Sequence, residues 1–78
     1  MSKLQPNGFK KFSKQETKVF AMLIQEYKGH EIAKALNLNE KTVGTYKLRL
    51  LEKSKSKTII GLYLFNQKHN IVPMPIAV

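Results

Sequence analysis

Apolar residues recur at helical spacing early in the chain, and the first stripe predicts a helix from about Lys14 to Glu26. Ser13 and Glu16 stand at its start with the spacing of a capping box, in which each side chain accepts a hydrogen bond from the other residue's backbone N–H. The stripe consists of Val19, Phe20, Leu23, Ile24 and Tyr27. Cap and stripe together predict that the first helix begins directly after Ser13.

The middle of the chain predicts a short helix, a tight turn and a longer helix. The segment from His30 to Leu36 is apolar on one face over about two turns, and Asn37-Leu38-Asn39 ends it. Asn39 is a good N-cap for a helix from Glu40 to about Lys53. One side of that longer helix carries Val43, Tyr46, Leu50 and Leu51, and the other carries Lys41, Gly44, Thr45, Lys47 and Leu48.

A fourth helix is predicted from Thr58 to Lys68, where apolar residues cover more than one face. Gly61 weakens that prediction, and the β-branched and aromatic residues would also suit a strand. A lone strand after three helices would have no partner, so the helix is favoured. The predicted fold class is all-α, with a four-helix domain at 13–72, a flexible basic arm at 1–12 and an extended tail at 73–78.

Size and composition are consistent with one small folded domain. Of the 78 residues, 42% are apolar and none is cysteine, so the core must form without disulfides. The apolar runs are far shorter than the roughly 20 residues that span a bilayer. We therefore expect a cytoplasmic protein without a membrane partner.

The net charge points to a polyanionic partner. Fourteen Lys and Arg residues against five acidic residues give +9, and nucleic acid is the leading candidate because each neutralised phosphate releases counterions. Six basic residues but only one acidic residue, Glu52, stand between Lys41 and Lys57. This concentration favours a nucleic-acid interface on the longer helix and its following loop over a charge that serves only solubility.

No residue pattern predicts catalysis, a metal or a cofactor. The chain has two His and no Cys, and all five acidic residues are Glu, so neither a cysteine zinc site nor a Ser-His-Asp set can form. His30-Glu31 lacks the second His of a zinc-protease motif. We therefore expect that the protein is not an enzyme.

Residues around the short and long helices also have the spacing of a known motif. They are Phe12, Ser13, Glu16, Val19, Leu23, Glu31, Ile32, Ala33, Leu36, Leu38, Thr42, Val43 and Lys53. From Phe12 to about Val72 the chain resembles the LuxR-type (GerE-like) helix-turn-helix of bacterial transcription regulators, including response-regulator output domains of the NarL-FixJ type. In a helix-turn-helix the second helix enters the major groove.

The resemblance implies a four-helix domain that binds double-stranded DNA as a dimer through its third helix. The residues that it places toward the bases are Gly44, Thr45 and Leu48. Those that it places toward phosphates are Lys41, Thr42, Lys47, Arg49, Lys55 and Lys57. It implies a homodimer contact on the helix at 58–68, through Ile59, Leu62, Tyr63 and Phe65.

Three departures from the family pattern bear on how DNA is recognised. Gly44 stands where Lys or Arg is common, either because the backbone approaches DNA closely or because an exposed position has drifted. Tyr46 replaces a common His and is expected to pack, and Ser54-Lys55-Ser56 replaces an apolar plug, so we expect a mobile loop. The base-facing residues hold one side-chain hydrogen-bonding group among them, which favours recognition of DNA shape and thymine methyl groups.

Two functions follow from the sequence. The favoured one is a sequence-specific DNA-binding transcription regulator associated with the nucleoid. The alternative is a protein-interaction module that pairs with a full-length regulator or with RNA polymerase and modulates it. A footprint with half-sites near one helical turn apart supports the first, and salt-labile, sequence-blind binding supports the second.

Overall fold

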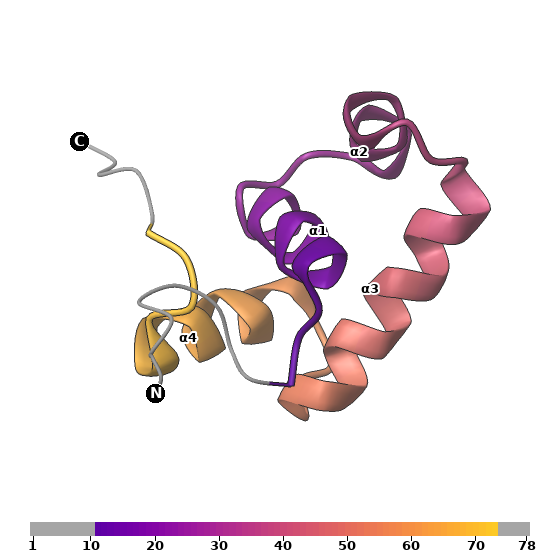
Figure 1. Cartoon of the computed structure of the whole chain (residues 1–78). Helices are drawn as coiled ribbons and strands as arrows, with labels where there is room; N and C mark the ends of the chain where they lie inside the picture. The colour runs from indigo at the N-terminus through magenta and orange to yellow at the C-terminus, as the bar shows by residue number, and fades with distance from the viewer. Residues whose placement is uncertain (1–10, 74–78) are drawn as a thin grey trace.

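The computed structural model describes residues 11–73, which form four α-helices (Figure 1). They are α1 (Lys14–Ile24), α2 (Gly29–Leu36), α3 (Glu40–Ser54) and α4 (Ile59–His69). No strand occurs in this part of the chain. The predicted all-α class and its four helices are confirmed, with every helix end within two residues of expectation. Most of the expected arm (1–10) and tail (74–78) lies outside the described residues.

Side-chain caps explain where α1, α3 and α4 begin. Ser13 Oγ accepts from the backbone N–H of Glu16 at 3.1 Å, and Glu16 Oε1 accepts from the N–H of Ser13 at 2.9 Å, which is the predicted capping box. Asn39 Oδ1 accepts from the N–H of Thr42 at 2.8 Å at the start of α3. Thr58 caps α4 in the same way. These bonds satisfy N–H groups that a helix start leaves without a partner.

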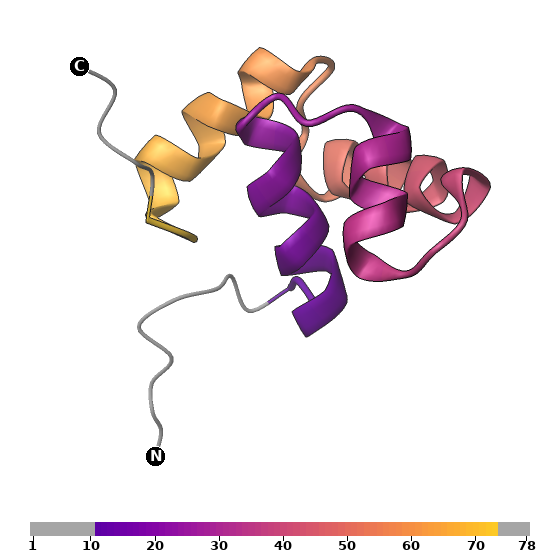
Figure 2. The ribbon, with the colours of Figure 1, turned by 90° about the horizontal axis from the view of Figure 1, so that it is seen from above.

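α1 lies in the middle of the fold and contacts each of the other three helices, whereas α2 and α4 do not pack on each other. Figure 2 shows this arrangement, with α4 on one side of α1 and the α2–α3 pair on the other. The buried apolar residues are Phe12, Val19, Phe20, Leu23, Ile24, Ile32, Ala33, Val43, Leu50, Leu62 and Ile71. All four helices therefore contribute to one core, which fixes the orientation of α3.

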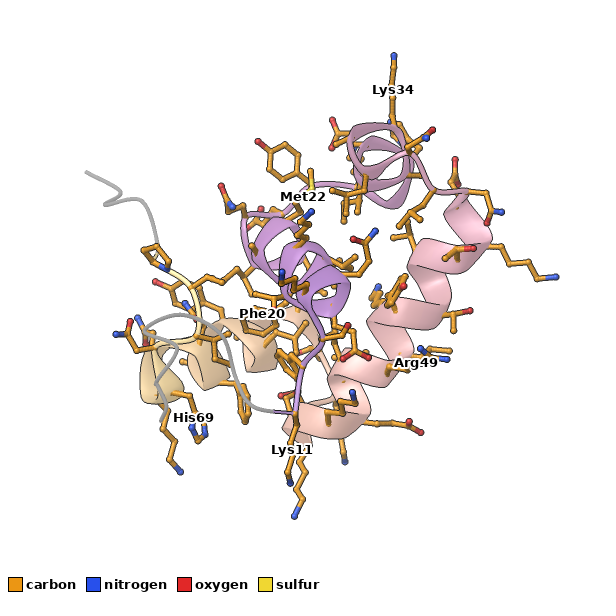
Figure 3. All side chains as sticks on the ribbon, in the orientation of Figure 1. Lys11, Phe20, Met22, Lys34, Arg49 and His69 are labelled. Atoms are coloured by element: carbon orange, nitrogen blue, oxygen red, sulfur yellow. The ribbon has the colours of Figure 1, made fainter. Side chains whose placement is uncertain are left out.

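Phe12 is part of this core, although its place in the sequence predicts that it lies in the flexible arm. Its side chain is buried, and its ring centroid lies 5.3 Å from that of Phe20 and 6.3 Å from that of Phe65. Figure 3 shows Phe20 between α1 and α4. The aromatic cluster joins the segment before α1 to α4, and aromatic pairs at such distances add to the energy of burial.

After α4 the chain packs against the core again, and the side chain of Asn66 fixes this segment by hydrogen bonds. Asn66 is 3% exposed. Its Oδ1 accepts from the backbone N–H of Val72 at 2.9 Å, and its Nδ2 donates to the carbonyl oxygen of Val72 at 3.0 Å. Asn70 adopts a left-handed conformation (φ 51°), and Ile71 is fully buried. Residues 70–72 therefore belong to the folded domain.

Two serines fill the space where the sequence suggested a missing apolar plug. Ser54 is buried, and its Oγ donates to the carbonyl oxygen of Leu50 at 2.8 Å. Ser54 Oγ and Ser56 Oγ lie 2.9 Å apart. Lys55 between them has φ 55°, and the N–H of Ser56 donates to the carbonyl oxygen of Leu51 at 2.9 Å. A hydrogen-bonded serine pair thus closes the end of α3.

Gly61→Ala is expected to destabilise the fold, although alanine is the better helix former. A Cβ at Gly61 would lie 2.8 Å from Cβ of Ser56, so the turn or α4 must shift. We expect a loss of about 1 kcal/mol, since overpacking outweighs the helix-propensity gain of about 1 kcal/mol. Gly44→Ala is the matched control: nothing lies within 4 Å of its Cβ, and we expect about 1 kcal/mol of stabilisation. Urea unfolding measures both, and equal stabilisation would contradict the close approach.

Candidate nucleic-acid interface

A three-residue turn at 37–39 joins α2 to α3 and holds α3 at the edge of the molecule (Figure 1). Asn37 has φ 58° and ψ 46°, a left-handed conformation that Asn tolerates better than most residues. The N–H of Leu38 donates to the carbonyl oxygen of Ala33 at 2.8 Å, and the Leu38 side chain packs against the core. Ile32 of α2 and Val43 of α3 are both buried. The turn is therefore fixed at both ends by packing.

The outer face of α3 carries the residues that the resemblance places toward the bases. Gly44, Thr45 and Leu48 are all exposed, and Leu48 is 65% exposed. Thr45 Oγ1 donates to the carbonyl oxygen of Lys41 at 3.2 Å, one turn earlier in the helix. The structure thus brings the three residues together on one solvent-facing strip, as their spacing predicts.

Cationic side chains surround this strip. The residues predicted to face phosphates are exposed except for Thr42, which is half-buried; the exposed ones are Lys41, Lys47, Arg49, Lys55 and Lys57. Lys47 and Arg49 flank Leu48 in sequence and so lie on opposite sides of it around the helix. The basic residues therefore border an uncharged centre instead of covering it.

Tyr46 and Arg49 form a second feature of α3. The Arg49 guanidinium carbon lies 5.9 Å from the centroid of the Tyr46 ring, within cation–π range. Tyr46 is half-buried and packs against the core, as expected for the residue that replaces a His. Both residues line a hollow with Thr42 and Thr45. The ring thus supports the Arg49 side chain, which Figure 3 shows on α3.

Lys53 and Glu16 fix the far end of α3 to the start of α1. Lys53 Nζ lies 2.8 Å from Glu16 Oε1 and donates to the carbonyl oxygen of Lys11 at 2.8 Å. Figure 3 shows Lys11 beside this end of α3. Both residues belong to the set that carries the family resemblance, but their spacing did not predict this ion pair, because they stand 37 positions apart in the chain.

The electrostatics of Glu16 follow from this pairing. Burial alone would raise the pKa of Glu16, since the carboxylate side chain is 5% exposed. Hydrogen bonds from Lys53 and from the Ser13 backbone, with the positive charges of Lys53 and Arg49, outweigh burial and lower the pKa below its ordinary value. Glu16 is therefore an ionised, buried anchor for α3.

The surface predicted for a partner on α4 is only partly exposed. Leu62 is fully buried in the core of this chain, and Ile59 and Phe65 are half-buried against it. Tyr63 is 37% exposed. The strongly exposed apolar residues are instead Ile60, at 71%, and Leu64, at 56%. Their spacing of four residues, with Tyr63 beside them, is the signal that could have found this face.

Within the described residues we find neither a cluster of metal ligands nor a membrane-spanning helix. No three His, Cys, Asp or Glu side chains gather within residues 11–73 so as to hold a metal ion. None of the helices in the same range is long and apolar enough to cross a membrane.

The model of one protein family, described as bacterial regulatory proteins of the luxR family, matches residues 10–65. Among curated proteins, the chain is similar to the "DNA-binding transcriptional activator EvgA" of Escherichia coli (strain K12) and of Shigella flexneri. Each is 39% identical over 59 residues, which cover 76% of this chain. The match spans 29% of the length of those relatives. No solved structure matches the chain significantly.

Proposed function

Because the chain belongs to the LuxR family of bacterial regulatory proteins, we propose that it binds double-stranded DNA sequence-specifically and regulates transcription, with α3 in the major groove. The observation that carries this proposal is the face of α3, where an exposed uncharged strip is bordered by exposed cations. An α-helix fits the major groove, and flanking Lys and Arg neutralise the phosphates on either side. The DNA-binding activator named among the relatives supports the same function.

In this proposal one group of residues positions α3 on the DNA, and another group recognises the base sequence. Lys41, Lys47, Arg49, Lys55 and Lys57, with Thr42, contact phosphates and set the register of α3 on the duplex. Gly44, Thr45 and Leu48 meet the base edges. The Lys53–Glu16 ion pair and the Asn39 cap hold the two ends of α3, so that the strip keeps one orientation.

We further propose that the chain binds DNA as a homodimer through α4. Ile60, Tyr63 and Leu64 present apolar surface to solvent, with Ile60 at 71% and Leu64 at 56% exposure. Large apolar side chains exposed together on one helix are typical of an association surface. The buried Leu62 supports this face from behind and does not itself meet the partner.

Selection from a random duplex library, followed by footprinting of the enriched sequence, tests the function. We expect an enriched motif with two protected half-sites about one helical turn apart, because a two-fold dimer places its two α3 helices on one side of the duplex. A Leu64→Glu variant should leave one half-site protected, since the charge opposes burial of α4. Lys68→Ala, on the same helix, is the control and should keep both.

The alternative function predicts a different result in the same experiment. If the chain acts only by pairing with a larger regulator or RNA polymerase, it enriches no motif, and its DNA binding is sequence-blind and disappears between ~50 and ~200 mM salt. That outcome would contradict the proposed function. No described residue favours the alternative over DNA binding, because the apolar residues of α4 suit a second copy equally well.

A further inference from the structure

The base-facing strip of α3 has no free hydrogen-bond donor. Gly44 has no side chain, and Leu48 is apolar. The hydroxyl of Thr45 donates its one proton to the carbonyl oxygen of Lys41 at 3.2 Å, so that only its methyl group and its oxygen lone pairs remain for a ligand. In this conformation the strip can accept a hydrogen bond and make apolar contacts, while its one side-chain donor is already bonded within α3.

This inventory matches one kind of base pair better than the others. In the major groove, guanine presents two acceptors, N7 and O6. Contact with the base-facing residues of α3 would remove the water bound to these acceptors without replacing its hydrogen bonds. A T·A pair presents the C5-methyl group of thymine and the N6 amino donor of adenine. The Leu48 side chain suits the methyl group, and the Thr45 oxygen suits the amino donor.

The surroundings of Leu48 favour burial of its apolar side chain in a groove of the DNA. Leu48 is 65% exposed on the folded chain, so its apolar surface is not used by the core. Lys47 and Arg49 stand on either side of it and are exposed. Cations on both flanks attract the phosphates of the two strands. Leu48, which lies between these cations, would then contact the base edges in the groove.

Gly44 adds an independent observation. Nothing in the protein lies within 4 Å of where its Cβ would be, and its φ is not in the left-handed region. The fold therefore does not require glycine at this exposed helix position, where it destabilises by about 1 kcal/mol relative to alanine. Its absent side chain leaves room one turn before Leu48 for a group outside the protein to approach the helix backbone.

From these residues we infer that Leu48 is the main specificity-determining residue and that the chain reads thymine C5-methyl groups. Leu48 and the Thr45 methyl group contact thymines, the Thr45 oxygen accepts from an adenine amino group, and Gly44 admits the base edges close to α3. The same contacts suit 5-methylcytosine, which carries a methyl group at the same place. This inference rests on the proposed DNA-binding function and names the base chemistry of that site.

The test replaces single thymines of the library-selected duplex with deoxyuridine, which removes only the C5-methyl group. Affinity is measured by fluorescence anisotropy at one fixed salt concentration. At the thymines under α3 we expect about fourfold weaker binding per methyl removed, the effect of exposing one buried methyl group. For a Leu48→Ala variant the same exchange should change affinity less than twofold at the Leu48 thymine, because the contact is already lost.

Two controls sharpen the result. Lys47→Ala should weaken binding to the thymine and uracil duplexes by the same factor, because a phosphate contact does not sense the methyl group. A 5-methylcytosine·guanine pair at the Leu48 position should bind more tightly than an unmethylated cytosine·guanine pair, again by about fourfold. Circular dichroism should show that both variants keep the fold, since residues 47 and 48 are exposed.

The possible failures are separable. An enriched motif whose thymines all tolerate uracil, or whose positions under α3 are guanines, overturns the inference and leaves sequence-specific DNA binding intact. A chain that enriches no motif overturns the proposed function itself. A uracil effect that persists unchanged in Leu48→Ala overturns the assignment to Leu48.

Discussion

Replacing Lys41, Lys47 and Lys57 together with alanine is expected to weaken binding of the selected duplex about a hundredfold at 0.15 M salt. All three side chains are exposed, and they stand on α3 and in the loop after it. Each phosphate contact contributes a slope of roughly 0.9 in log affinity against log salt, so three contacts account for about two orders of magnitude at this concentration. The slope itself should fall by roughly 2.7.

A charge-matched variant separates local contact from net charge. Lys18, Lys34 and Lys68 are exposed lysines on α1, α2 and α4, and Figure 3 shows Lys34 pointing away from the body of the molecule. Replacing them with alanine lowers the net charge from +9 to +6, the same as the first variant. We expect less than a tenfold loss of affinity and a slope close to that of the unchanged chain. Equal losses in the two variants would show that charge acts without a docked α3.

Local features of the fold were predictable from the sequence because they depend on neighbouring residues. The Ser13–Glu16 capping box and the Asn39 cap involve residues three positions apart, and the structure contains both. The amphipathic pattern of α3 likewise assigned Val43 and Leu50 to the core and Leu48 to solvent. Spacing within one helix determines such features, whatever the rest of the chain does.

Features that join distant segments were not predictable in this way. The burial of Phe12 depends on rings in α1 and α4, and the Lys53–Glu16 pair joins residues 37 positions apart. The bonds of Asn66 to Val72 also depend on how the chain turns after α4. A single sequence contains the residue types for these contacts but not their distances, and only tertiary packing brings them together.

The candidate site likewise contains features that were predictable from the sequence and features that were not. The exposed strip on α3 followed from helix periodicity and the resemblance. The exposed surface of α4 did not follow from periodicity, because apolar residues occupy more than one face of that helix. Periodicity therefore could not separate Leu62, which is buried, from Ile60, which is 71% exposed. The serine pair at the end of α3 was also missed, since polar residues ordinarily suggest a loop and here they bond to one another and to the backbone.

Glu16→Ala is expected to destabilise the fold by about 3 kcal/mol and, through α3, to weaken DNA binding. The substitution removes the cap acceptor for Ser13 and the partner of Lys53 at once. Loss of a cap contributes about 1 kcal/mol. Loss of a buried ion-pair partner contributes up to 3 to 5 kcal/mol, here discounted to about 2 because the Lys53 side chain is 36% exposed. Glu16→Gln keeps a cap acceptor and should lose only about 2 kcal/mol.

The pH dependence of stability tests whether the charge of Glu16, and not only its shape, holds the fold. The pKa of Glu16 in the folded state is lowered from its ordinary value of 4.5, so the unfolded chain binds its proton more readily. The stabilisation from the carboxylate is therefore fully present well above pH 4.5 and is lost as pH falls through the folded-state pKa. Urea unfolding should show the difference between the unchanged chain and Glu16→Gln shrinking below pH 4.5. A difference that stays constant down to pH 3 would mean that packing and capping, rather than the ion pair with Lys53, account for the role of Glu16.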